Sequence, residues 1–67
     1  MQIKRLEKER REQGLTKAAL GELAGIAPST LSWIESGRFT PYPGQLERLA
    51  QALGVKDAEA LLESVEV

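Results

Sequence analysis

The sequence predicts an all-α fold, a compact single domain of five short helices. Three observations support this prediction. Apolar residues recur three and four positions apart in segments of helical length, glycine or proline stands at the ends of these segments, and no segment of strand length alternates between apolar and polar residues. We therefore expect one helical domain over residues 1–67.

Length and composition exclude several classes of protein. A chain of 67 residues buries only about 60% of its unfolded surface, which leaves no room for a deep catalytic cavity. The sequence has no histidine and no cysteine, the residues that most often serve as general bases and metal ligands. It also has no apolar run of the roughly 18 residues that a membrane span needs. We expect a cytoplasmic protein that is not an enzyme and binds no cofactor, no metal and no membrane.

The first predicted helix starts at Ile3, with Leu6 as the next apolar residue of a charged helical run. It ends at Gly14, because glycine favours the left-handed backbone at a helix C-terminus. Thr16 is a good N-cap for the second helix, which ends at Gly25. The first helix carries two oppositely charged pairs at a spacing of four residues, Glu7 with Arg11 and Lys8 with Glu12. The second helix carries apolar residues at helical spacing, which are Leu20, Leu23 and Ala24.

The third and fourth predicted helices both open with proline. Pro28 and Pro43 stand at first-turn positions, where the missing N–H of proline costs no hydrogen bond. The third helix closes at Gly37 and the fourth at Gly54. Their predicted buried residues are Leu31 and Ile34 on the third, and Leu46, Leu49, Ala50 and Leu53 on the fourth.

A short fifth helix is predicted over about residues 58–65. Asp57 precedes it as an N-cap, a position at which aspartate is favoured. Leu61 and Leu62 are its apolar residues. This segment is the fifth helix of the predicted fold.

The second and third helices together predict a helix-turn-helix motif over about residues 16–36. Two short helices joined by a tight turn that contains glycine are typical of this motif. Gly21 and Gly25 let the two helices approach closely, and Ile26 fills the corner between them. The outer face of the third helix is then free to enter the major groove of DNA.

The run LTKAALGELAGIAPSTLSWIESG, with RREQG before it and LERLAQALGV after it, resembles the phage repressor and Cro type of helix-turn-helix protein, the xenobiotic response element family of transcriptional regulators. The resemblance covers about residues 3–62. It implies a five-helix, repressor-like DNA-binding domain that acts as a sequence-dependent transcriptional regulator. It further implies double-stranded DNA as the partner, with a homodimer on a palindromic operator and the helix 28–36 as recognition helix in the major groove.

The resemblance also implies roles for individual residues. The start of the second helix would lie beside the DNA backbone, the recognition helix would face the bases, and the following loop would meet phosphates. A further pair, Arg10 and Glu35, would join the first and third helices as a structural ion pair. The implied DNA contacts are Thr16 and Lys17, then Pro28, Ser29, Thr30, Ser32 and Trp33, then Arg38 and Thr40.

Three departures from the family pattern concern the strength of base recognition. No Arg, Lys, Gln or Asn lies between Pro28 and Gly37, so the side chains that bind guanine or adenine through two hydrogen bonds are absent from the recognition helix. Lys17 stands where the family most often has glutamine. Ala27 lacks the side-chain oxygen of a normal N-cap, at a cost of about 1 kcal/mol. We expect specificity to depend more on thymine-methyl contacts, dimer geometry and DNA deformability.

Trp33, the only tryptophan, leaves three alternatives open. It lies on the side of its helix away from Ile34, and all three aromatic residues fall within ten positions of one another. The indole could be covered by a small cluster with Phe39 and Tyr42. It could instead contact DNA, or it could lie in an interface with a protein or a second copy of the chain.

The charge distribution supports an alternative function. Residues 1–40 carry a net charge of +2 and residues 41–67 a net charge of −3, which sum to the overall −1. A chain with a pI near 5.4 is acidic for a domain whose affinity would come from phosphates. The alternative is a helix-turn-helix fold that acts as a protein-interaction module, such as an antitoxin or an anti-regulator.

Overall fold

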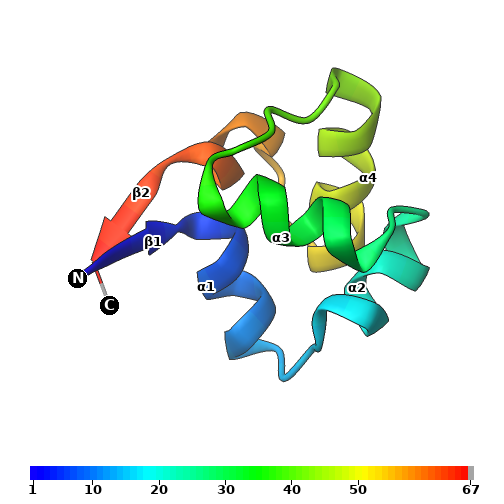
Figure 1. Ribbon diagram of the computed structural model, residues 1–67, viewed down its shortest axis with the longest axis horizontal. Helices are drawn as coiled ribbons and strands as arrows, with labels where there is room; N and C mark the ends of the chain where they lie inside the picture. Colours follow the sequence, from blue (N-terminus) through cyan, green and yellow to red (C-terminus); the bar gives the residue numbers. More distant parts are fainter. Residues whose placement is uncertain (67) are drawn as a thin grey trace.

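The computed structural model describes residues 1–66, so Val67, the last residue of the predicted domain, lies outside the described residues. Within residues 1–66, four α-helices surround one core, and two short strands meet beside it (Figure 1). In chain order the elements are β1 Gln2–Lys4, α1 Arg5–Glu12, α2 Lys17–Ala24, α3 Pro28–Ser36, α4 Pro43–Leu53, the 3-10 helix η1 Ala58–Leu62 and β2 Ser64–Glu66.

One cluster of buried apolar side chains holds the helices together. α4 packs against α2 and η1, while α3 packs against α2 and β1. Burying one large aliphatic side chain stabilises the fold by about 1.5–3 kcal/mol. Each helix contributes at least one of the largest fully buried side chains, which are Leu6, Leu20, Leu31, Ile34, Leu49 and Leu61.

The predicted helix ends are confirmed at the positions that frame α2 and α3. The Thr16 hydroxyl accepts a hydrogen bond from the Ala19 N–H at 3.0 Å and caps α2. Gly25 and Gly37 end α2 and α3 with φ of 68° and 82°, in the left-handed region where a side chain would be strained. As expected, Ala27 makes no side-chain cap for α3.

Surface pairing on α1 also follows the prediction, because Glu7 with Arg11 and Lys8 with Glu12 are ion pairs. Leu23, one of the apolar residues at helical spacing on α2, does not belong to the core. Its side chain is 63% exposed, since the buried side of the short helix α2 is filled by Leu20, Gly21 and Ala24.

The predicted fifth helix is wrong. The segment forms only the five-residue η1 and then continues as β2. β2 pairs antiparallel with β1, with Ile3 opposite Val65, so the fold is mainly helical with a two-stranded sheet. The Arg5 N–H also donates to the Glu63 carbonyl at 2.8 Å, which extends the pairing. Strands of three residues are too short to show an alternating pattern, so they could not be predicted from the sequence.

α1 starts later than predicted, because the first residues of the chain form a strand of this sheet. Ile3 lies in β1, and α1 begins at Arg5. Lys4 before it has an extended backbone and makes no side-chain cap. The sheet therefore joins the beginning of the chain to the segment after η1, and Figure 1 shows the two strands side by side at the left of the molecule.

Candidate nucleic-acid interface

The corner between α2 and α3 is closely packed. The Ile26 N–H donates to the Gly21 carbonyl at 2.9 Å, and a Cβ atom added at Gly21 would lie 2.3 Å from the Ile26 carbonyl oxygen. From α4, Arg48 Nε donates to the Ala24 carbonyl at 2.8 Å and ties the end of α2 to the core. These contacts fix the position of α3 relative to α2.

A buried ion pair fixes α3 from the other side. Arg10 of α1 donates to both carboxylate oxygens of Glu35, at 2.8 Å from Nε and 3.1 Å from Nη2. Its Nη1 also donates to the Leu15 carbonyl at 2.9 Å. The hydrogen bond to Glu35 raises the pKa of Arg10 above its ordinary value, although burial of the guanidinium acts in the opposite direction. The pair therefore joins α1 to α3 through two charge-assisted hydrogen bonds.

These contacts leave one side of α3 uncovered. Leu31, Ile34 and Glu35 are buried, whereas Ser29 and Trp33 are exposed and the other predicted base-facing positions range from half-buried to exposed. Figure 1 shows α3 crossing the middle of the molecule, from the α2–α3 turn to the vicinity of β1. The exposed side of α3 is therefore a continuous helical surface supported from behind by the core.

Lys17 and Ser32 meet on this side. Lys17 is the first residue of α2, and its Nζ donates to Ser32 Oγ at 3.0 Å. Both residues are half-buried. Sequence reasoning missed this contact, because the two residues are 15 positions apart and meet only through the angle between the two helices.

The remaining predicted contacts surround the same helix. Pro28 is exposed at the start of α3, and Thr30 is half-buried. Arg38 and Thr40 are exposed in the loop after α3, where the Arg38 N–H donates to the Trp33 carbonyl at 2.8 Å. Among the predicted residues, the structure thus brings Lys17 to Ser32 and Arg38 to the backbone of Trp33.

Charge around α3 is arranged differently from charge on α1. On α1, Arg5, Lys8 and Arg11 each pair with a glutamate one turn away. In residues 1–66, no carboxylate forms a salt bridge with Lys17 or Arg38. Two cations near α3 are therefore available to an anionic partner, whereas those of α1 are largely neutralised by their neighbours.

Comparison with known sequences identifies the fold family. Residues 4–62 match the family described as the helix-turn-helix domain. The chain belongs to this helix-turn-helix family. It is 35% identical over 54 residues to an uncharacterised HTH-type transcriptional regulator of Methanothermobacter thermautotrophicus, covering 81% of this chain and 78% of that protein. It is 44% identical over 50 residues to another such regulator from Sinorhizobium fredii, covering 75% of this chain and 65% of that protein. No solved structure shows significant similarity.

In this helix-turn-helix domain the indole of Trp33 stands apart from the other aromatic rings. Phe39 and Tyr42 pack edge to face with ring centroids 5.8 Å apart, the one ring pair among residues 1–66. Trp33 is 56% exposed, and no group in this part of the chain accepts a hydrogen bond from its indole N–H. The arrangement favours an external contact for Trp33 over an internal aromatic cluster.

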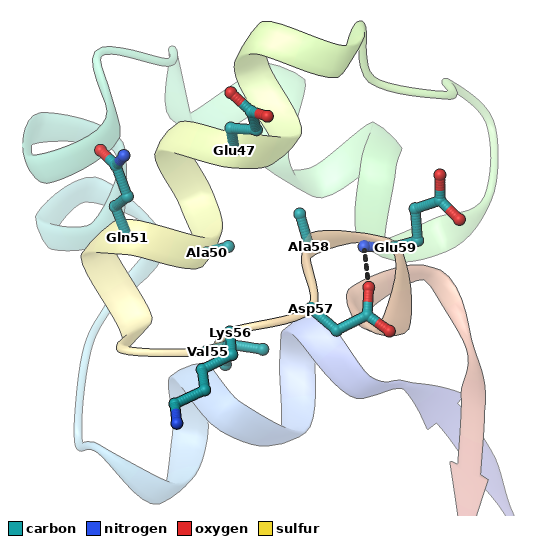
Figure 2. Close-up of a pocket in the computed structure, with 8 residues that line it drawn as sticks. All are labelled: Glu47, Ala50, Gln51, Val55, Lys56, Asp57, Ala58 and Glu59. Atoms are coloured by element: carbon teal, nitrogen blue, oxygen red, sulfur yellow. Dashed lines mark hydrogen bonds between the residues drawn. The ribbon is translucent and has the colours of Figure 1, made fainter.

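The helix-turn-helix domain also has an acidic hollow away from these residues. It has a volume of about 410 Å³ and lies between α4 and the segment 55–59. Figure 2 shows Glu47 on α4, with Asp57 and Glu59 on the opposite wall, where Asp57 accepts a hydrogen bond from the Glu59 N–H at 3.2 Å. None of the predicted DNA contacts lines it.

Residues 1–66 contain no group of three or more His, Cys, Asp or Glu side chains placed to hold a metal ion. No helix in that range has the length and apolar character to cross a membrane.

Proposed function

We propose that this protein is a sequence-dependent DNA-binding transcriptional regulator of the repressor and Cro type, with α3 in the major groove. The observation that carries the proposal is the exposed side of α3, held from behind by the Arg10–Glu35 pair and bordered by the salt-bridge-free cations Lys17 and Arg38. The two relatives are both named as HTH-type transcriptional regulators, which supports the same function.

In this proposal, contacts to the DNA backbone set the position of the protein. Thr16 at the start of α2 and Arg38 with Thr40 in the loop after α3 bind phosphates. Pro28 faces the bases at the start of α3, and Thr30 lies at the edge of that face. Backbone contacts of this kind fix register and supply most of the affinity, but they carry no direct sequence information.

The side chains that reach the bases are short apart from one. Ser29 and Ser32 can donate or accept hydrogen bonds, and each hydroxyl alone discriminates weakly between bases. The exposed indole of Trp33 supplies the largest contact area on α3 and fits an apolar contact such as a thymine methyl group. Sequence dependence therefore comes from several modest contacts and from DNA shape.

We further propose that the protein binds a palindromic operator as a homodimer. Half-sites in the major groove on one face of DNA are about 34 Å apart, one helical turn. The longest extent of the described chain is 28 Å, so a single copy does not reach both half-sites. Two copies related by a two-fold axis satisfy that spacing.

Selection of bound sequences from random duplex DNA tests this function. The purified chain is expected to enrich a palindrome, and binding is expected to weaken steeply as salt rises, because phosphate contacts release counterions. Arg38→Ala should weaken binding to all duplexes and make the slope of log affinity against log salt shallower by about one per protomer.

Lys56→Ala is the matched control, because Lys56 lines the acidic hollow beside α4 and not the surface of α3. It should leave the salt slope close to that of the unaltered chain. If the unaltered chain retains no duplex at low salt, the proposed function is wrong.

The second candidate is a protein-interaction module, such as an antitoxin or an anti-regulator. The observation that favours it is the exposure of two aromatic side chains, 56% for Trp33 and 67% for Tyr42, because aromatic residues are enriched in protein interfaces. The same selection separates the two functions. Failure to retain DNA, together with Trp33 becoming protected in a complex with another protein, would favour the second.

A further inference from the structure

We infer that Lys17 and Ser32 form a composite pair that reads guanine in the major groove. This inference rests on the proposed function and deepens it. The observation behind it is the 3.0 Å hydrogen bond from Lys17 Nζ to Ser32 Oγ, which brings a cation from α2 onto the outer side of α3. α3 itself has no Arg, Lys, Gln or Asn, so this contact supplies a charge that the recognition helix lacks.

The Ser32 hydroxyl takes part in this hydrogen bond as an acceptor. An ammonium group has three N–H donors and no acceptor, so Ser32 Oγ is the acceptor in this contact. Within residues 1–66 no carbonyl or carboxylate accepts the Ser32 hydroxyl proton. Ser36, one turn along α3, behaves differently, because its hydroxyl donates to the Trp33 carbonyl at 3.1 Å. The Ser32 proton therefore stays available to a group in the groove.

The pair consequently presents two neighbouring donors. Lys17 uses one N–H on Ser32 and keeps two, while Ser32 keeps its O–H. Guanine exposes two neighbouring acceptors, N7 and O6, in the major groove, whereas adenine exposes the acceptor N7 beside the N6 amino donor. The positive charge of Lys17 also disfavours an amino group at the second position. Guanine is the base whose edge matches both donors.

The backbone around the pair is fixed before DNA arrives. Thr16 caps the turn of α2 on which Lys17 lies, and the contact of Gly21 with Ile26 sets the angle between α2 and α3. A donor pair whose backbone is held in place by the fold loses less conformational freedom on binding, which favours discrimination. The pair therefore assigns Lys17 to a base edge, in place of the phosphate contact that the family resemblance implies.

Base substitution at the operator tests the inference. The selected site should contain one guanine per half-site under this pair. Replacing that guanine by adenine, or by 7-deazaguanine, which lacks the N7 acceptor, should lower the affinity of the unaltered chain about tenfold. Lys17→Met and Ser32→Ala should each abolish this preference, and the double variant should lose no more than either single variant, because the two groups act together.

Ser36→Ala is the matched control, since it removes a hydroxyl from the same helix and should keep the guanine preference. Thermal unfolding of each variant, followed by circular dichroism, verifies that the fold is retained. The inference is overturned if Lys17→Met weakens binding equally whichever base stands at that position, or if Ser32→Ala keeps the preference. Those outcomes leave the proposed function intact, whereas failure of the unaltered chain to bind any duplex overturns the function as well.

Discussion

Arg10 and Glu35 are the charged residues that the described part of the chain buries. All the carboxylate oxygens and guanidinium nitrogens of the pair have partners, and no buried side-chain N or O atom in residues 1–66 lacks one. Their partnership came from the family resemblance, because two charges 25 positions apart show no periodic relation in the sequence. The structure supplies the reason for the pair, since α1 and α3 must be joined without covering the outer side of α3.

The first prediction concerns this pair. Glu35→Ala should lower the free energy of unfolding by about 3–5 kcal/mol, because it leaves the Arg10 charge buried without its partner. Urea unfolding measures the change. Replacing both residues by methionine is the informative control, since removing both charges together should cost much less than removing one. An unchanged midpoint for Glu35→Ala would contradict a buried pair.

The second prediction concerns Trp33. Trp33→Ala should weaken DNA binding by roughly tenfold or more, as truncation of a central aromatic contact often does, and should change stability by less than about 1 kcal/mol because the side chain is 56% exposed. Fluorescence anisotropy with a labelled operator and thermal unfolding measure the two effects. Leu23→Ala, which removes a similarly exposed apolar side chain from α2, should leave both nearly unchanged. Loss of stability without loss of binding would place the indole in a supporting role.

Helices were predictable wherever a glycine, a proline or a capping hydroxyl marks their ends. The element that could not be predicted is the sheet, because the pairing of Ile3 with Val65 joins residues that are far apart in sequence. Of the two leucines predicted for the last segment, Leu61 is 0% exposed in η1 and Leu62 is half-buried against the core. Apolar residues thus identified what packs on the core, while long-range pairing decided the backbone conformation.

The third prediction concerns the α2–α3 corner. Gly21→Ala should destabilise the protein by about 1–3 kcal/mol, because the added methyl group collides with the backbone carbonyl of Ile26, although alanine is the better helix former. Gly44→Ala is the matched control within α4. There the added Cβ would meet only Arg48 Nη1, at 3.9 Å, so the higher helix propensity of alanine should keep or raise stability by up to about 1 kcal/mol. Chemical denaturation measures both. Equal effects of the two substitutions would contradict a closely packed corner.

At the scale of the whole molecule, charge is divided along the sequence. Residues 1–40 carry a net charge of +2 and contain α1, α2 and α3. Residues 41–67 carry a net charge of −3, and α4, η1 and β2 lie in this part of the chain. This division of charge, and which residues lie near the third helix, could be predicted from the sequence. It could not reveal that Lys17 reaches Ser32, because that contact depends on how two helices meet.

The last prediction concerns the assembly on DNA. If two copies bind one palindrome, their α3 helices must enter the major groove on the same face of the duplex, about 34 Å apart. Inserting five base pairs between the half-sites rotates one of them by about half a helical turn and moves it away by half a turn, so the two copies can no longer meet. Binding to this altered site should lose its cooperativity, while affinity for an isolated half-site stays the same.

Analytical ultracentrifugation with labelled duplexes measures the number of bound copies, and titration measures the cooperativity. Inserting ten base pairs is the control, because it restores the rotational alignment but not the distance. Contact between the two copies needs both, so this site should also bind without cooperativity. Recovery with ten base pairs would mean that the copies interact through the DNA and not through a shared interface. One bound copy per intact palindrome would contradict the homodimer, and it would leave the contacts of a single α3 as the whole source of sequence dependence.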